Sequence, residues 1–70
     1  MEFSEYLKKR RSELNLRCMD VAERIGWTPM YYGRFENGKL LPTEHNCKYF
    51  AKALDVPEQT IKNFIMKKHK

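Results

Sequence analysis

Long apolar stretches and targeting signals are missing from this chain of 70 residues. No segment approaches the roughly 18 consecutive apolar residues that a membrane-spanning helix requires. The first five residues, Met-Glu-Phe-Ser-Glu, lack the basic start and the apolar run of a secretory signal. We therefore expect a cytoplasmic protein that does not contact a membrane.

Cysteine and histidine are scarce, with two residues of each type. Cys18 and Cys47 are too few for a disulfide scaffold and do not form a C-x-x-C pair, so we expect two reduced thiols. The spacing of these cysteines, together with His45 and His69, matches no zinc site. The sequence therefore predicts neither a metal site nor a cofactor.

Signatures of catalysis are also missing, since the sequence has no paired-carboxylate motif, nucleophile elbow or phosphate-binding loop. A dyad of Cys18 or Cys47 with His45 is conceivable, but no motif supports it. A chain of this length forms one small domain with a thin margin of stability, and it is too small for most enzyme scaffolds. We expect a protein that is not an enzyme.

The charge balance is basic. The 14 Lys and Arg residues exceed the 9 Asp and Glu residues, which gives a formal net charge of +5. Most of this excess comes from Lys62, Lys67, Lys68 and Lys70, in a C-terminal stretch without an acidic residue. A basic protein favours a polyanionic partner, either nucleic acid or an anionic membrane. The charge alone does not locate the binding site.

The apolar residues repeat with the period of an α-helix throughout the chain, and strand-like alternation is absent from the sequence. Five helices are predicted, over residues 4–14, 18–25, 29–36 or 37, from the Thr43 cap to 54, and from 57–58 onward. Thr28 is a second expected N-terminal cap, and Asn15 and Gly26 are the expected left-handed residues after a helix. The sequence therefore predicts an all-α domain over residues 1–66, followed by a basic tail over 67–70.

Residues 18–37 combine a helix, a four-residue turn and a second helix. The turn is Gly26-Trp27-Thr28-Pro29, in which glycine ends the first helix, and threonine and proline start the second. This spacing is typical of the helix-turn-helix, whose second helix presents its N-terminal residues to the major groove of DNA.

The flanking residues resemble the Cro/CI-type, or XRE, helix-turn-helix family of phage repressors and related regulators. The resemblance covers about residues 3–62, and it is carried by Leu16, Val-Ala-Glu-Arg-Ile-Gly at 21–26, Arg-Phe-Glu-Asn-Gly-Lys at 34–39, Pro-Thr at 42–43 and Phe-Ala-Lys-Ala-Leu-Asp-Val at 50–56. It implies a compact five-helix fold like that of lambda repressor, a two-fold symmetric dimer, and a pseudo-palindromic operator read by the third helix.

The resemblance places Pro29, Met30, Gly33 and Arg34 toward the bases. Arg34 can donate two hydrogen bonds to guanine, and Met30 can contact a thymine methyl group; an ordinary solvated or ion-paired arginine is the alternative at Arg34. Pro29 has no backbone N–H, so we expect it to define the helix start. Gly33 costs about 1 kcal/mol relative to alanine in a helix, which suggests a close approach to DNA.

The resemblance also predicts contacts to the DNA backbone from Arg17, Thr28, Tyr31, Asn37 and Lys39. Such contacts position a protein without reading sequence. Tyr31 has simple surface packing as its alternative, whereas we expect Tyr32 in the core.

The start of the second helix departs from the family pattern. Family members usually have a Ser or Thr cap followed by a glutamine that binds a phosphate, and this chain has Arg17-Cys18 instead. Arg17 could replace the phosphate contact, but the cap would be lost. Trp27 stands where a small aliphatic residue is usual, and it either packs under the turn or lies against the DNA backbone.

Two further roles follow from the resemblance. Arg11 and Glu36 occupy the positions of an ion pair that supports the third helix. Ile61, Phe64 and Ile65 lie on one face of the last helix, where family members dimerise; closing the monomer core is their alternative role.

The sequence predicts a sequence-specific, double-stranded DNA-binding transcriptional regulator. It would be a homodimeric repressor that autoregulates a phage or mobile-element operon, of the Cro-like, restriction-modification controller, antitoxin or anti-CRISPR-associated type. The alternative is a protein-interaction module, such as an anti-CRISPR or antirepressor, which binds a protein partner with the same fold. The missing glutamine, the weak donors Pro29 and Met30, and the apolar face of the last helix keep this alternative open.

Overall fold

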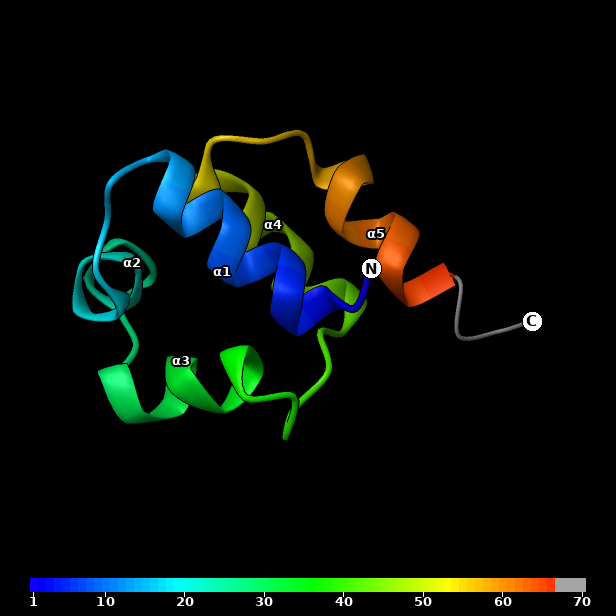
Figure 1. Cartoon of the computed structure of the whole chain (residues 1–70). Helices are drawn as coiled ribbons and strands as arrows, with labels where there is room; N and C mark the ends of the chain where they lie inside the picture. Colours follow the sequence, from blue (N-terminus) through cyan, green and yellow to red (C-terminus); the bar gives the residue numbers. More distant parts are fainter. Residues whose placement is uncertain (67–70) are drawn as a thin grey trace.

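The computed structural model describes residues 1–66, which form five helices and no strand (Figure 1). Each predicted helix is present, and each observed start lies within one residue of the predicted one. The all-α fold is confirmed. The helices are α1 (Phe3–Glu13), α2 (Cys18–Ile25), α3 (Pro29–Glu36), α4 (Glu44–Leu54) and α5 (Glu58–Met66). Every one of these helices is too short or too polar to cross a membrane.

Local signals define most helix ends. Asn15 and Gly26 adopt left-handed conformations, with φ of +57° and +92°, as predicted. The Thr28 hydroxyl accepts the backbone N–H of Tyr31 at 3.1 Å and so caps α3. The predicted side-chain cap at Thr43 is wrong, because the Thr43 side chain makes no capping hydrogen bond. Its backbone carbonyl accepts the Asn46 N–H at 2.9 Å instead.

Apolar side chains from all five helices form one core. α4 packs against α2 and α5, while α1 and α2 both pack against α3. The Phe50 ring lies edge-on to Phe3 and Phe35, at centroid distances of 5.1 and 5.0 Å. The buried apolar residues are Phe3, Leu7, Val21, Ala22, Tyr32, Phe35, Cys47, Phe50, Ala51, Ala53, Leu54 and Ile61. α3 is thus held from two sides, and its remaining face is free for solvent or a ligand.

Two arginines bind the C-terminal end of α4, a role that the sequence did not predict for them. Arg10 of α1 donates from Nε to the Leu54 carbonyl at 3.0 Å, and Arg24 of α2 donates from Nη1 to the Ala53 carbonyl at 3.0 Å. The last carbonyls of a helix lack partners within the helix, so these bonds satisfy groups that would otherwise need water. Asp55 then ends the helix in a left-handed conformation, with φ of +57°.

The apolar face of α5 belongs largely to the monomer core. Ile61 is fully buried, and this corrects its assignment to a dimer interface, because it has no exposed area left for a partner. Phe64 and Ile65 are half-buried. The Phe64 ring packs against Phe3 and Tyr6 at centroid distances of 5.4 and 5.0 Å. The basic tail predicted at 67–70 lies outside the described residues.

Candidate nucleic-acid interface

The connection between α2 and α3 is short, and Trp27 fixes it to the core. The Trp27 N–H donates to the Ala22 carbonyl at 2.9 Å, directly after the left-handed Gly26. The indole ring stacks on Phe35, with a centroid distance of 5.5 Å and an interplanar angle of 15°, and meets Phe50 edge-on. Of the two roles open for Trp27, packing under the turn is the one that the structure shows.

α3 presents two different faces. Tyr32, Phe35 and Glu36 are buried, whereas Pro29, Met30 and Arg34 are exposed, with Met30 exposed to 76%. Gly33 lies between these faces, and a Cβ atom added to it would have no neighbour within 4 Å. No packing contact within residues 1–66 therefore requires glycine at this position. The side chains predicted to read bases lie together on the solvent side of one helix.

A bidentate ion pair joins α1 to α3. Arg11 Nε lies 2.6 Å from Glu36 Oε2, and Nη2 lies 3.1 Å from Oε1. Arg11 Nη1 also donates to the Leu16 carbonyl at 3.0 Å, so one guanidinium connects α1, the following loop and α3. Burial raises the pKa of Glu36, whereas the hydrogen bond from Arg11 and its positive charge lower it. The net pKa of Glu36 is below its usual value. Glu36 is thus a buried carboxylate that stays charged at neutral pH.

Two neutral groups complete the surroundings of Glu36. The Cys18 thiol donates to Glu36 Oε1 at 3.5 Å, and the buried Tyr32 hydroxyl lies near the same carboxylate without the geometry of a hydrogen bond. Burial, and then the proximity of Glu36, raises the pKa of both Cys18 and Tyr32. The Cys18 thiol therefore makes its hydrogen bond within the domain, to Glu36 of α3.

A family model described as a helix-turn-helix domain matches residues 2–64, a range that contains nearly all of the five helices. The chain belongs to the helix-turn-helix family. Neither the curated proteins nor the solved structures gave a match. The family indicates a DNA-binding regulator. Below, helix-turn-helix refers to α2, the turn that follows it and α3.

The cations around this helix-turn-helix differ in their partners. Arg17, just before α2, binds Asp20 through Nε and Nη2 at 3.1 and 3.2 Å, yet its side chain remains 74% exposed. The Asp20 carboxylate also accepts the backbone N–H of Arg17 at 2.8 Å. The expected loss of a cap is therefore compensated in part by Asp20. Arg34 and Lys39 are exposed, and no acidic group within residues 1–66 forms an ion pair with either.

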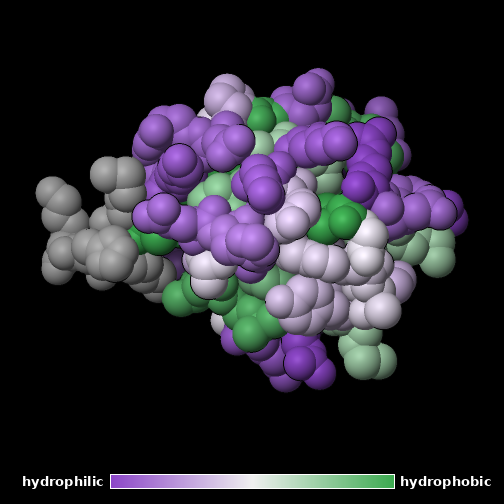
Figure 2. Space-filling model, turned by 180° about the vertical axis from the view of Figure 1, so that it is seen from behind, coloured by the Kyte–Doolittle hydropathy of each residue, from purple (hydrophilic) through white to green (hydrophobic). Residues whose placement is uncertain are grey.

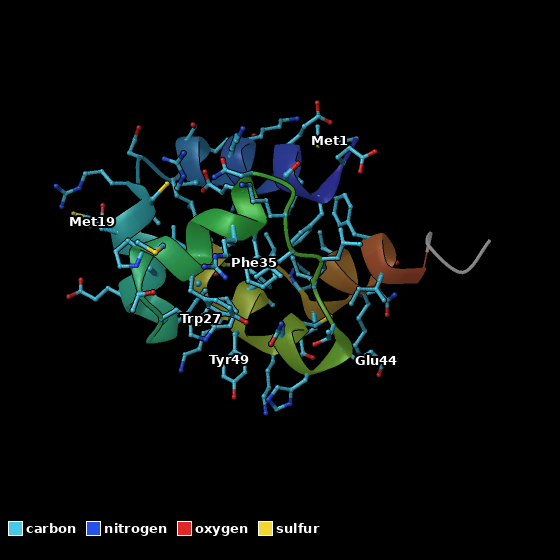
Figure 3. All side chains as sticks on the ribbon, turned by 90° about the horizontal axis from the view of Figure 1, so that it is seen from below. Met1, Met19, Trp27, Phe35, Glu44 and Tyr49 are labelled. Carbon is cyan, nitrogen blue, oxygen red and sulfur yellow. The ribbon has the colours of Figure 1, made fainter. Side chains whose placement is uncertain are left out.

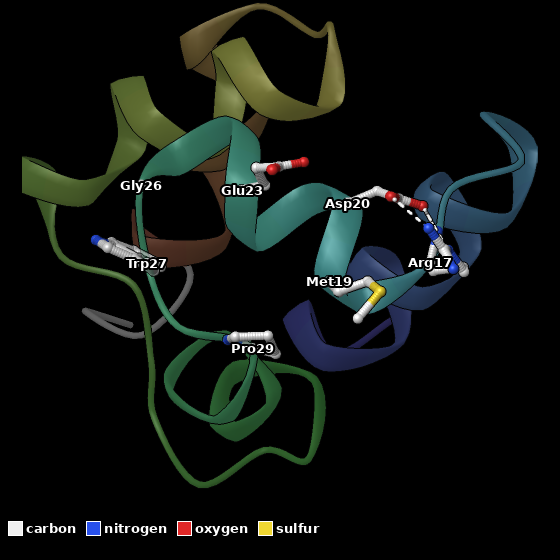
Figure 4. Close-up of a pocket in the computed structure, with 7 residues that line it drawn as sticks. All are labelled: Arg17, Met19, Asp20, Glu23, Gly26, Trp27 and Pro29. Atoms are coloured by element: carbon white, nitrogen blue, oxygen red, sulfur yellow. Dashed lines mark hydrogen bonds and ion pairs between the residues drawn. The ribbon is translucent and has the colours of Figure 1, made fainter.

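An open hollow of about 560 Å³ separates α2 from the start of α3 in this helix-turn-helix (Figure 4). Met19 and Pro29 both lie in its lower part, while Arg17 and Asp20 pair at its rim. Met19 is 50% exposed. The remaining lining residues are Glu23, Gly26 and Trp27. Sequence reasoning missed Met19, because the helical period marks it only as a solvent-facing residue.

Aromatic side chains also reach the surface beside α3, and we call Trp27, Tyr31, His45 and Tyr49 the aromatic face. Tyr31 is 39% exposed and meets Trp27 edge-on at 4.8 Å, and Tyr49 lies 6.3 Å from Trp27. His45 continues the row at 5.8 Å from Tyr49. Figure 3 shows Trp27 between Phe35 and Tyr49. Seen from behind, strongly hydrophilic side chains cover much of the upper part of the surface, and pale side chains lie together in the middle and on the lower right (Figure 2).

Proposed function

We propose that this chain is a sequence-specific, double-stranded DNA-binding transcriptional regulator that inserts α3 into the major groove. The observation that carries the proposal is the arrangement of α3, which buries Tyr32, Phe35 and Glu36 and leaves Pro29, Met30 and Arg34 exposed on its other side. A recognition helix needs one face bound to its own domain and one face free for base edges. We propose a repressor of the Cro/CI-type, cytoplasmic and without enzymatic activity, that acts on a phage or mobile-element operon.

Rigid attachment of α3 supports this function. The Arg11–Glu36 pair fastens the end of α3 to α1, and Thr28 caps its start. Side chains that read bases must keep their geometry within a fraction of an ångström, so a helix tied at both ends is better suited than a loosely packed one. Arg34 is then presented on a fixed backbone, with no competing carboxylate in the described range, and can donate to guanine O6 and N7.

Contacts with the DNA backbone would come from both sides of α3. Arg17 retains free N–H groups, because Asp20 occupies only two of the five donors of a guanidinium. Thr28, Tyr31, Asn37 and Lys39 are all exposed at the two ends of α3 and along it. These residues offer a hydroxyl, a phenol, an amide and an ammonium group, all of which bind phosphate oxygens in protein–DNA complexes.

We also propose a homodimer, since a two-fold operator requires two copies of α3. Phe64 and Ile65 are only half-buried, and Phe64 lines a shallow hollow of about 240 Å³ together with Tyr6, Thr60 and Asn63. A second copy that packs on this surface would cover the exposed parts of Phe64 and Ile65. Small domains bury a modest fraction of their surface, so such packing would also add stability.

A protein partner is the second candidate function, and the aromatic face favours it. Tyr31 on α3 and Trp27 and Tyr49 beside it together expose part of their rings, and Lys48 Nζ lies 5.4 Å from the centroid of the Tyr49 ring. Tyrosine and tryptophan are enriched at protein–protein interfaces. An anti-CRISPR or antirepressor of this fold would use such a surface rather than the exposed Met30 and Arg34 of α3.

Selection from a random duplex library separates the two functions. We expect the wild-type chain to enrich a pseudo-palindromic sequence with a guanine in each half-site. Its affinity, measured by fluorescence anisotropy, should fall by about 0.9 decade per decade of salt for each phosphate neutralised. Failure to enrich any sequence at low salt would contradict the proposal and leave the protein-partner function.

Variants of Arg34 then test the reading of guanine. Arg34→Ala should weaken specific binding by about 1–3 kcal/mol and relax the preference at one base pair per half-site. Arg34→Lys keeps the charge but loses the bidentate geometry, so it should relax the same position. Lys52→Ala is the matched control, because it removes one charge from the last turn of α4. In Figure 1 this end of α4 lies in the upper part of the molecule, away from α3 in the lower part. Unchanged discrimination in both Arg34 variants would overturn the assignment.

A further inference from the structure

The first two side chains of α3 offer no hydrogen-bond donor to a base edge. Pro29 has no backbone N–H, and Met30 carries only a weak acceptor. The Thr28 hydroxyl accepts the Tyr31 N–H, and its own O–H stays available for the phosphate contact proposed above. An apolar surface therefore stands at the place where a recognition helix approaches the major groove.

Met19 extends this surface from α2. Its side chain is half exposed and lines the hollow between the helices together with Pro29, and Figure 4 shows both on the same side of that hollow. Met30 follows Pro29 and is the most exposed large apolar side chain of the described residues, at 76%. We call Met19, Pro29 and Met30 the apolar reading surface.

Nothing in the fold of residues 1–66 accounts for these methionines. Neither belongs to the core, and neither packs against it as a partly buried neighbour. Methionine is flexible and polarisable, which suits it to contacts with irregular apolar groups. The function proposed above uses Arg34 for specificity and leaves the apolar reading surface without a ligand.

The chemistry of the major groove restricts what such a surface can recognise. Guanine, adenine and cytosine present hydrogen-bonding groups there and carry no methyl group, whereas thymine presents the C5-methyl group beside its O4 acceptor. An apolar surface pressed on polar base edges removes their water without replacing its hydrogen bonds, and this is unfavourable. A methyl group at C5 of a pyrimidine is the base feature that matches it.

We infer that Met19, Pro29 and Met30 form a methyl-reading site that selects a thymine in each half-site of the bound DNA. The inference rests on the proposed function, because it needs α3 in the major groove. Met30 and Arg34 are four residues apart on one face of α3, or about 6 Å along its axis. The selected thymine thus lies within about two base pairs of the guanine that Arg34 reads, since stacked bases are about 3.4 Å apart. The same site accepts the methyl group of 5-methylcytosine.

Replacement of single atoms in the DNA tests this site. The probe is the duplex enriched by the wild-type chain, remade with deoxyuridine in place of each thymidine in turn, so that only a methyl group is lost. We expect about fourfold weaker binding at one thymine per half-site and no change at the others, since burial of one such carbon contributes about 0.8 kcal/mol. At the same position, a duplex with 5-methylcytosine should bind about fourfold more tightly than one with cytosine.

Protein variants assign the effect to the methionines. Met30→Ala should remove most of the thymine–uracil difference, and Met19→Ala should reduce it. Leu41→Ala is the matched control, because Leu41 is an exposed apolar residue, at 52%, outside the apolar reading surface, and it should keep the difference in full. Thermal unfolding should show that these exposed substitutions leave the fold intact.

The outcomes separate this inference from the proposed function. Equal binding of every uracil duplex, or a difference that persists in Met30→Ala, would overturn the methyl-reading site while sequence-specific binding itself stands. If the library yields no enriched sequence, the proposed function fails and the methyl-reading site fails with it.

Discussion

Removal of Arg11 provides the sharpest test of how this fold holds its recognition helix. In an Arg11→Met variant, the Glu36 carboxylate would lose both hydrogen bonds from the guanidinium, at 2.6 and 3.1 Å. Glu36 is only 4% exposed, so water cannot replace them without opening the helix packing. Only the weak Cys18 thiol bond at 3.5 Å would remain.

The expected loss of stability is large for a domain of this size. Breaking a buried ion pair by removal of one partner costs about 3–5 kcal/mol, because it leaves an uncompensated buried charge. Urea unfolding can be followed by the fluorescence of the single tryptophan, Trp27, which stacks on Phe35 in the folded state. With an m-value of about 1 kcal/mol per M urea, a loss of 3 kcal/mol lowers the midpoint by about 3 M.

The loss of stability in Arg11→Met should depend on pH, in a direction that follows from the pKa of Glu36. In the wild type the folded pKa of Glu36 is lowered, so its charge contributes stability above the unfolded pKa of about 4.3, and that stability is lost as the pH falls through the folded value. In Arg11→Met the burial remains without the arginine, so we expect a raised pKa. The contribution of Glu36 would then be present below about pH 4.3 and lost as the pH rises through the raised value. The gap between wild type and variant should therefore shrink from pH 7 to pH 4.

A double variant completes the test. Arg11→Met combined with Glu36→Leu removes the charge along with its partner, and we expect it to recover most of the lost stability, because apolar replacements of buried ion pairs are often neutral or stabilising. A loss below about 1 kcal/mol in Arg11→Met, or a gap that is the same at pH 7 and pH 4, would refute the reasoning.

Three further predictions concern the recognition helix and α5. Gly33→Ala should raise the free energy of unfolding by up to about 1 kcal/mol, because its Cβ meets no neighbour, and it should weaken DNA binding if the backbone approaches a base; thermal unfolding and anisotropy measure the two effects. A stabilised variant with full affinity would contradict the close approach. Ile61→Ala should cost about 2–5 kcal/mol in the monomer. Asn63→Arg, exposed beside Phe64, should instead lower the mass seen in sedimentation equilibrium, and a wild type that is monomeric at micromolar concentration would exclude the dimer.

Short-range signals explain why the helices could be predicted so closely. Gly26, Thr28 and Pro29 act through the conformation of their own backbone or through a bond to a residue three positions away, so their effect hardly depends on the rest of the molecule. Thr43 shows the limit of such signals. It stands at the predicted cap position before α4, but its side chain makes no capping bond.

The role of α5 could not be decided from periodicity. The stripe of Ile61, Phe64 and Ile65 identifies an apolar face but not what covers it. In the structure Ile61 is fully buried within the monomer, whereas Phe64 and Ile65 remain partly exposed to solvent. Which part of a stripe remains accessible depends on the angle at which two helices pack, and this angle is set by side chains on both.

The sequence by itself determined the fold class, the helix boundaries and the helix-turn-helix pattern, because these follow from local backbone preferences and a helical period. Only the tertiary structure decided which positive charges remain for a polyanion. Arg10, Arg11 and Arg24 are occupied by the Leu54 carbonyl, Glu36 and the Ala53 carbonyl, while Arg34 and Lys39 have no ion pair in the described chain. Arg10 and Leu54 are 44 positions apart. Contacts over such distances form only when the helices have packed, so no local pattern reveals them.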